Sequence, residues 1–228
     1  MQGKAVIVTG AFGALGKVVA KAFGDRGAKV ALVDKAPAPA SLDLPGETLV
    51  LGGVDLTKAD EARGVVEQVL ARFGSLDVLV NVAGGFRWET VAEGDPATWD
   101  LLYHLNVVTA ANMSRAAIRA LSASGAGRIV NVGAGGAVKA AAGMGAYAAS
   151  KAGVHRLTEA LAEELKGRVN VNAVLPSIID TPQNRADMPK ADFGAWVSPQ
   201  DLAAVILFLA SDEARAVTGA LVPVNGRV

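Results

Sequence analysis

The chain has 228 residues, about half of them hydrophobic, which is enough for one α/β domain with a large buried core. Lysine plus arginine and aspartate plus glutamate both number 22, so the formal net charge is zero and no basic excess indicates binding to nucleic acid or to an anionic membrane. The absence of cysteine excludes disulfides, thiol catalysis and cysteine-ligated metals.

Short apolar strands alternate with helices along the chain. The predicted strands cover residues 4–9, 28–33, 48–51, 76–80, 128–132, 169–174 and 220–224, and the predicted helices cover residues 14–24, 55–73, 96–121, 144–166 and 199–210. This order predicts a single domain over residues 1–228, built as a doubly wound, Rossmann-like parallel sheet with helices on both faces. No long apolar run predicts a membrane span and no charged leader precedes the first strand, so we expect a cytoplasmic protein.

A glycine-rich turn joins the first strand to the first helix. In the sequence Thr-Gly-Ala-Phe-Gly-Ala-Leu-Gly at 9–16, Gly10 would allow a tight turn and Gly16 would let the helix pack close to the sheet. Backbone N–H groups and the helix dipole at such a turn face a pyrophosphate. The sequence therefore predicts a dinucleotide site at this turn.

An acidic residue, Asp34, ends the second strand about 20 residues after the turn, where a carboxylate can accept hydrogen bonds from the adenosine ribose. It would repel a 2′-phosphate, so NAD(H) is favoured over NADP(H) as the cofactor. The cation of Lys35 next to it leaves NADP(H) open. The alternative is an aspartate that only ends a strand.

A tyrosine and a lysine four residues apart, Tyr147 and Lys151, lie on one face of a predicted helix. An ammonium beside a phenol lowers the phenol pKa from about 10 toward working pH, which suits a general acid or base. A tyrosine that only packs is the alternative. The two histidines, His104 and His155, have no clustered acids, so no metal site is expected. His155 is assigned to packing or a subunit contact, and His104 to a structural role.

With these residues in order, the chain resembles the short-chain dehydrogenases/reductases over essentially its whole length. The motifs that match are Thr9, Gly10 and Gly16, residues 55–56 (Asp-Leu), residues 81–84 (Asn-Val-Ala-Gly), Asn106, the pair Tyr147 and Lys151, and residues 176–181. The resemblance implies cofactor contacts from Gly10, Phe12, Gly13, Ala14, Leu15, Asp34, Asp55, Leu56, Val82, Ala83, Gly84, Tyr147, Lys151, Pro176, Ile179 and Thr181. It also implies a homo-oligomer, either a dimer or a tetramer.

The same resemblance implies three catalytic roles. Tyr147 would be the acid or base of hydride transfer, Lys151 would lower the phenol pKa and hold the nicotinamide ribose, and Asn106 would hold a water that relays protons. The family's catalytic serine falls at Ala134. Three explanations stay open: a substrate that is easy to reduce, a hydrogen bond supplied by Tyr147 or water, or a site with little catalysis.

The missing serine, with the sequences at 82–85, 154–155 and 180–196, resembles the dihydropteridine reductases. Phe86, Trp88 and Trp196 are candidates to stack on a flat substrate, or to provide hydrophobic cover only, and residues 183–197 are a candidate lid. Three hypotheses follow: an NAD(P)H-dependent enzyme of a small carbonyl, alcohol or imine substrate, a quinonoid dihydropteridine reductase, and a non-catalytic dinucleotide sensor or scaffold.

Overall fold

Seven parallel strands form one sheet in the order β3-β2-β1-β4-β5-β6-β7. The computed structural model describes all residues, 1–228. The strands are β1 (Ala5–Thr9), β2 (Lys29–Val33), β3 (Thr48–Leu51), β4 (Val78–Asn81), β5 (Gly127–Val132), β6 (Val169–Pro176) and β7 (Leu221–Val224). The direction in which strands are added reverses between β3 and β4, so β1 and β4 flank the switch point at which open α/β sheets bind ligands. The predicted doubly wound fold is confirmed.

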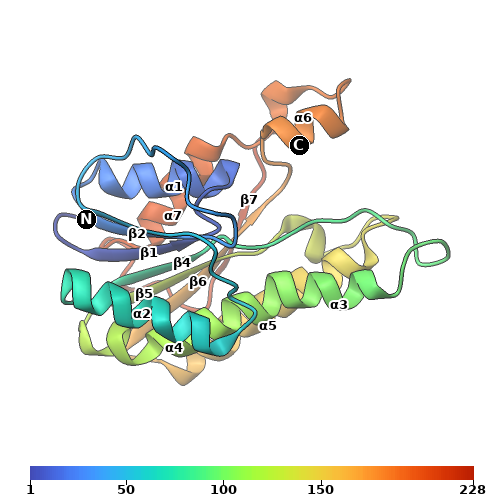
Figure 1. Cartoon of the computed structure of the whole chain (residues 1–228). Coiled ribbons are helices and arrows are strands. Elements are labelled where there is room, and N and C mark those ends of the chain that lie inside the picture. Colours follow the sequence, from blue (N-terminus) through green and yellow to red (C-terminus); the bar gives the residue numbers. More distant parts are fainter.

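Helices cover both faces of the sheet (Figure 1). One face carries α1 (Ala14–Gly24) and α7 (Pro199–Leu209), and the other carries α2 (Ala59–Phe73), α4 (Thr109–Ala123) and α5 (Gly145–Glu164). Successive strand side chains point to opposite faces, so Val6 and Val8 pack toward α1 and α7, whereas Ile7 packs toward α2 and α4. The strands are apolar on both sides because both sides are covered.

The prediction of one long helix over residues 96–121 is wrong in detail. This part of the chain consists of α3 (Ala97–Tyr103), a π-helical turn η1 (His104–Val108) and α4. Asn106 lies at the centre of this turn, and the hydroxyl of Thr109, the first residue of α4, donates a 2.7 Å hydrogen bond back to the Leu105 carbonyl. The apolar spacing of about 3.6 residues in the sequence does not reveal a single turn that is wider by one residue, so this π-helical turn was not predicted. Such turns are frequent at functional sites.

A short helix also occurs where the sequence analysis expects only a lid. Residues 183–197 include most of α6 (Pro182–Asp187) and the 3₁₀ turn η3 (Phe193–Ala195). In Figure 1, α6 projects beyond the carboxyl edge of the sheet, near the C-terminus. The backbone N–H of Arg227 donates to the Ala195 carbonyl at 2.8 Å, so the chain end supports this segment. A further 3₁₀ turn, η2 (Gly135–Ala137), follows β5.

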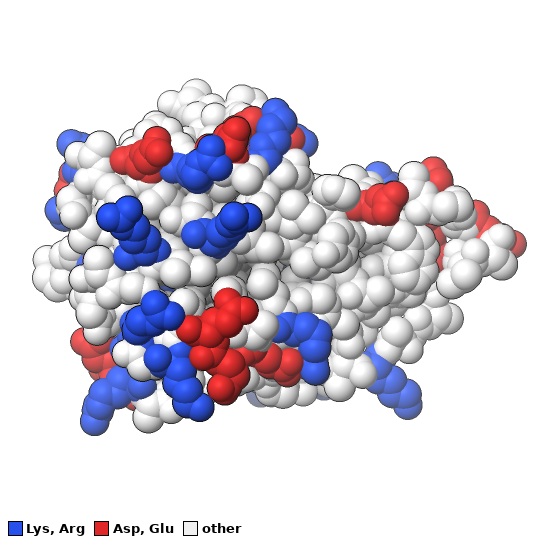
Figure 2. Space-filling model, turned by 90° about the horizontal axis from the view of Figure 1, so that it is seen from below, with Lys and Arg blue, Asp and Glu red and all other residues white.

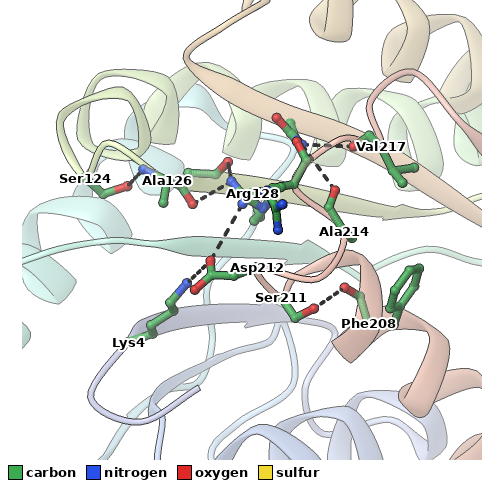
Figure 3. Close-up of polar contacts among 12 residues, drawn as sticks. Lys4, Ser124, Ala126, Arg128, Phe208, Ser211, Asp212, Ala214 and Val217 are labelled. Atoms are coloured by element: carbon green, nitrogen blue, oxygen red, sulfur yellow. Dashed lines mark hydrogen bonds and ion pairs between the residues drawn. The ribbon is translucent and has the colours of Figure 1, made fainter.

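At the amino-terminal ends of the strands, opposite the carboxyl edge, a buried arginine joins several segments (Figure 3). Arg128, at the start of β5, is 5% exposed and donates to the carbonyls of Ala126 and Gly127 at 2.9 and 3.0 Å. Asp212, after α7, lies 3.8 Å from this guanidinium and accepts a 3.0 Å hydrogen bond from Lys4. These contacts join the beginnings of β1 and β5 to the segment after α7, which leaves the carboxyl edge for the site.

The surface carries charges of both signs. Figure 2, seen from the side of α2, α4 and α5, shows acidic and basic side chains interspersed over one half of the face and few charges over the other. No large field of one sign is visible there, in agreement with the zero formal net charge. None of the helices has the length and apolar character needed to span a bilayer.

Candidate active site

A single large cavity of about 1520 Å³ opens at the carboxyl edge of the sheet. Its volume exceeds the roughly 300–1,000 Å³ that is usual for a small-ligand pocket, so it has room for a dinucleotide and a second molecule. Of the residues predicted for the site, those that line it are Gly10, Phe12, Gly13, Ala14, Leu15, Asp34, Asp55, Leu56, Val82, Ala83, Gly84, Phe86, Trp88, Ala134, Tyr147, Lys151, Pro176, Ile179 and Thr181. Asn106 and Trp196 do not line it.

The glycine turn lies at one end of this cavity. Gly10 has a φ of +61°, and a Cβ there would come within 2.9 Å of the Ala83 backbone. A Cβ on Gly16 would overlap the Gly10 carbonyl. Both positions therefore require glycine, because the turn passes directly against the neighbouring strand end and the helix packs directly against the turn.

Helix α1 begins at this turn without a side-chain cap. Its N-cap, Gly13, makes no side-chain hydrogen bond, and the first amides of a helix have no partner within the helix. These N–H groups and the positive end of the dipole face the cavity at Ala14 and Leu15. The cradle fits the pyrophosphate of a dinucleotide.

Asp34 lies at the end of β2, beside the turn. Its carboxylate accepts hydrogen bonds from the Phe12 N–H at 2.9 Å and the Ala36 N–H at 3.0 Å. Each carboxylate oxygen has a second acceptor site, so the group can still receive ribose hydroxyls. The Lys35 ammonium is engaged elsewhere, in a 2.9 Å ion pair with Asp55.

Asp55 is held by further contacts. It accepts hydrogen bonds from both the N–H and the hydroxyl of Thr57, at 3.1 and 2.6 Å. These bonds and the Lys35 ammonium lower the pKa of the Asp55 carboxyl to about 2. Asp55 is therefore a fixed negative charge on the wall of the cavity at all physiological pH values.

Tyr147 enters the cavity from the first turn of α5. Its ring meets Phe86 edge to face, with ring centroids 4.8 Å apart and planes at 80°. Burial raises the pKa of the Tyr147 phenol to about 12. The expectation that Lys151 brings this pKa down toward neutrality is wrong for this structure, because loss of hydration dominates and the ammonium does not bond the phenol.

Lys151 lies one turn further along α5 and is 6% exposed. Its ammonium donates a 2.7 Å hydrogen bond to the carbonyl of Val132, at the end of β5. Burial lowers the pKa of Lys151 to about 8. Tyr147 and Lys151 thus share a cavity and a helix face, but they are not hydrogen-bonded to one another.

Asn106 supports the cavity wall from behind. Its amide accepts from the Gly85 N–H at 3.0 Å and donates to the Gly85 carbonyl at 3.1 Å and to the Ser150 hydroxyl at 2.9 Å. Both amide hydrogens are used, so a relay water would have to bind the remaining lone pair of the side-chain oxygen or the main chain. A Cβ on Gly84 would collide with this amide, which explains the glycine there.

The substrate end of the cavity is partly apolar. Phe86 and Trp88 are 53% and 60% exposed at its mouth, and Met144 and Met188 also line it. Trp196 is not part of this rim: it is 7% exposed and packs on Phe193, with ring centroids 4.8 Å apart. Its assignment as a stacking residue is corrected, because this tryptophan is a buried residue within the lid segment and does not line the cavity.

Three polar residues of α6 lie within the predicted lid segment, although none of them is singled out by the sequence as a cavity residue. Gln183, Asn184 and Asp187 line the cavity. Thr181 is the N-cap of α6: its hydroxyl accepts the Asn184 N–H at 3.2 Å, and Pro182 occupies the first helical position. Threonine followed by proline is a helix-start signal, so the sequence did contain the information.

A dinucleotide cradle and a tyrosine–lysine pair in one cavity define an NAD(P)-dependent oxidoreductase. The chain belongs to the short-chain dehydrogenases: the profile of the family described as short chain dehydrogenase matches residues 4–192. The 3-oxoacyl-[acyl-carrier-protein] reductase FabG of Vibrio cholerae is 32% identical over 99% of this chain and 97% of its own length. The 2-(S)-hydroxypropyl-CoM dehydrogenase 3 of Xanthobacter autotrophicus is also 32% identical, over 99% of this chain and 96% of its own.

Solved structures give the same result. The aldohexose dehydrogenase of Thermoplasma acidophilum superposes with a TM-score of 0.89 at 28% identity, over 99% of this chain and 93% of that one. These relatives confirm the family and the type of reaction. They differ in substrate, and the resemblance to the dihydropteridine reductases stays a prediction.

Proposed function

We propose that the protein is an NADH-dependent reductase of a small carbonyl or imine compound. The observation that carries the proposal is one continuous cavity that joins the uncapped glycine turn at Gly13 to Tyr147 and Lys151. Gly13 and the first turn of α1 would hold the pyrophosphate of a dinucleotide, and Tyr147 and Lys151 would lie beside its nicotinamide end. The substrate then occupies the remaining space under α6.

When bound, a dihydronicotinamide would supply the hydride for the substrate carbon. Tyr147 donates the proton to the substrate oxygen or nitrogen, and its raised pKa keeps the phenol in the protonated form at neutral pH. Lys151 holds the nicotinamide ribose and stabilises the phenolate that is left behind. Asn106 fixes the wall at Gly85 and, we propose, holds a water for proton return through its free acceptor site.

NAD(H) is preferred over NADP(H) in this proposal because the acceptor at the adenosine end is an unpaired carboxylate. Asp34 binds backbone amides only, whereas Lys35 is held by Asp55. A 2′-phosphate would face the Asp34 charge without a free cation beside it. Release of Lys35 from Asp55 would be needed before it could receive a phosphate.

The substrate end favours a flat, conjugated molecule. Phe86 and Trp88 offer aromatic faces at the mouth, and Ala134 provides no hydroxyl to polarise a substrate oxygen. Loss of one such donor costs about 10²–10³ in rate, so an electron-poor conjugated substrate suits this site better than a simple ketone. A quinonoid dihydropteridine is the specific candidate of this kind.

A substrate panel with both cofactors tests the proposal. NADH or NADPH oxidation would be followed with a quinonoid dihydropterin, an ortho-quinone, an aliphatic ketone and a 3-oxoacyl thioester, the last because of the acyl-reducing relatives. We expect NADH-dependent turnover that is fastest with the conjugated compounds. Turnover of the thioester alone would remove the conjugated-substrate assignment, and NADPH use alone would remove the cofactor assignment.

A non-catalytic sensor or scaffold is the alternative from another class, and only Ala134 favours it. Tight NADH binding without turnover of any compound on the panel would support it. The intact pair of Tyr147 and Lys151 argues for the reductase, because dinucleotide binding at the glycine turn does not require a buried phenol.

A homo-oligomer, dimer or tetramer, is the partner that we propose. Trp99 and Tyr103 on α3, which are 44% and 52% exposed, are aromatic side chains that could contribute to such a contact. Sedimentation at several protein concentrations would test the assembly. A cytoplasmic location is proposed with it, and nothing in the fold requires nucleic acid or a membrane for the reaction.

A further inference from the structure

The second buried residue on the lysine face of α5 is a histidine with no role in the proposed chemistry. His155 is 3% exposed and lies four residues after Lys151, so both side chains leave the helix on one side. Its Nε2 accepts a 3.3 Å hydrogen bond from the backbone N–H of Ala134. The imidazole thus contacts the residue that stands at the family's serine position.

The end of β5 is held at three consecutive residues. The Lys151 ammonium binds the Val132 carbonyl at 2.7 Å, the Gly133 N–H donates to the Val174 carbonyl at 2.9 Å, and the Ala134 N–H donates to His155. One helix face therefore holds both ends of a three-residue segment that lines the cavity.

The packing around His155 is specific. A Cβ on Gly133 would lie 2.6 Å from His155 Nε2 and 3.2 Å from a methyl group of Leu175. The ring therefore fills the space that a side chain at residue 133 would need. The absence of a side chain at Gly133 lets the end of β5 pack directly against the imidazole, so these two residues together fix where the β5 backbone lies in the cavity wall.

Ala134 has no spare polar group to replace the missing hydroxyl. Its N–H is used by His155 and its carbonyl accepts the Ala137 N–H at 3.1 Å. The Ala134 backbone therefore offers the substrate no free donor, and a donor at this position would have to come from Tyr147 or from a water. The position of the Ala134 backbone relative to Tyr147 then decides how closely the substrate approaches the phenol.

We infer that His155 is a positioning residue, whose neutral imidazole holds the Ala134 backbone and so fixes the cavity wall against which the substrate meets Tyr147. The inference rests on the proposed function, because it needs Tyr147 and Lys151 as the reacting pair. An N–H donor requires an unprotonated Nε2, so the proton of the neutral ring is on Nδ1. Protonation of Nε2 would place its N–H opposite the N–H of Ala134. Two donors would then face each other, and the hydrogen bond would be lost.

The charged groups that act on the ring all lie on α5. Burial lowers the pKa of His155, Arg156 and Lys151 lower it further, and Glu159 opposes them. The strands packed against the ring contribute the Gly133 backbone and the Leu175 side chain, neither of which titrates. His155 is therefore neutral at pH 7, and the contact is lost only at acid pH.

Three variants test the inference through the pH dependence of reduction. His155→Gln keeps an acceptor oxygen without titration, His155→Leu removes the acceptor, and His104→Gln is the control at the exposed histidine, whose Nδ1 contacts only the Asp100 carbonyl. The kcat and KM for the substrate would be measured from pH 5 to 8, with melting temperature and NADH affinity for each variant.

For the wild-type chain we expect kcat to fall at acid pH, below the ordinary histidine pKa. His155→Gln should lose this acid limb and keep neutral-pH activity within a few fold. His155→Leu should lower kcat about 10-fold at all pH values with NADH affinity nearly unchanged, and His104→Gln should behave as wild type. An acid limb that survives in His155→Gln, or a folded His155→Leu with wild-type kcat, would overturn the inference.

Imidazole ¹⁵N spectra of the NADH-bound chain separate this inference from the proposed function. We expect His155 to show a protonated Nδ1, an acceptor Nε2 and a titration midpoint below the ordinary histidine value. A protonated Nε2 at pH 7 would overturn the inference even in an active enzyme. A chain with the expected spectrum that reduces nothing on the panel would instead overturn the proposed function.

Discussion

The Lys151 ammonium donates its 2.7 Å hydrogen bond to the Val132 carbonyl, not to the phenol of Tyr147. In this arrangement the phenol keeps a high pKa and the lysine a low one, because both groups are buried. A protonated phenol is the state that reduction requires. Tyr147 is therefore in the protonated form at neutral pH, and the Lys151 ammonium is held by the main chain and not by the phenol.

Tyr147→Phe tests the proton donor. We expect turnover to fall about 10²–10⁴-fold, the contribution of a positioned general acid, while NADH affinity changes little because Phe retains the ring that contacts Phe86. Steady-state rates and a fluorescence titration with NADH would measure the two quantities. Tyr103→Phe is the matched control, since Tyr103 is the other tyrosine and is exposed on α3. Full activity in Tyr147→Phe would refute the assignment.

The low pKa of Lys151 predicts a basic limb in the reduction rate. Burial lowers this pKa to about 8, so the ammonium is present below that pH and is lost as pH rises through it, whereas the phenol, with a pKa of about 12, stays protonated. The value of kcat/KM for NADH, which reports the free enzyme, should therefore decrease above about pH 8.

Initial rates from pH 6 to 10 would measure this limb. Lys139→Met, at an exposed lysine outside the cavity, should leave the profile unchanged. A wild-type profile that is flat to pH 10 would show that Lys151 does not titrate as its burial implies.

The fold was predictable because each strand carries its own signal, an apolar β-branched run followed by a turn residue, and the strands recur at βαβ spacing. The Tyr147 and Lys151 pair was predictable because four-residue spacing sets a helix face. The phenol pKa was not, because spacing gives the face but not the hydration of the groups. The burial of Trp196 was not either, since a tryptophan that packs on Phe193 and one that stacks on a ligand have the same sequence signal.

The His155 contact illustrates the same limit. Sequence spacing places this histidine two turns from Tyr147, too far for direct chemistry. What it contacts depends on how β5 ends against α5, which is set by the absence of a side chain at Gly133. The packing of two elements that are distant in the sequence decides the role, and one sequence contains no direct record of it.

Asp34→Ser tests the cofactor preference. The substitution removes the charge that would repel a 2′-phosphate and the acceptor for the ribose hydroxyls. A hydrogen bond to a charged group contributes about 1.5–3 kcal/mol, so NADH affinity should fall about 10–100-fold while the NADPH-to-NADH ratio of kcat/KM rises. Asp43→Ser, at an exposed acid in the loop after β2, is the control. An unchanged ratio would mean that Asp34 does not meet the ribose.

Ala134→Ser tests how the site operates without the usual hydroxyl. The residue is 4% exposed and lines the cavity, and its backbone groups are already bonded to His155 and Ala137. A serine there would add the only side-chain donor at this position. Rates with an aliphatic ketone should rise, by up to about 10²-fold if the hydroxyl reaches the substrate oxygen, whereas rates with a quinonoid dihydropterin should change little.

The comparison needs a control for the mutation itself. Ala141→Ser, at an exposed alanine beyond η2, adds the same hydroxyl outside the cavity and should change neither rate. A folded Ala134→Ser chain with no gain on any ketone would mean that the carbonyl does not lie against residue 134. The substrate would then be oriented by the rim at Phe86 and Trp88, and the proton from Tyr147 would be delivered without help from β5.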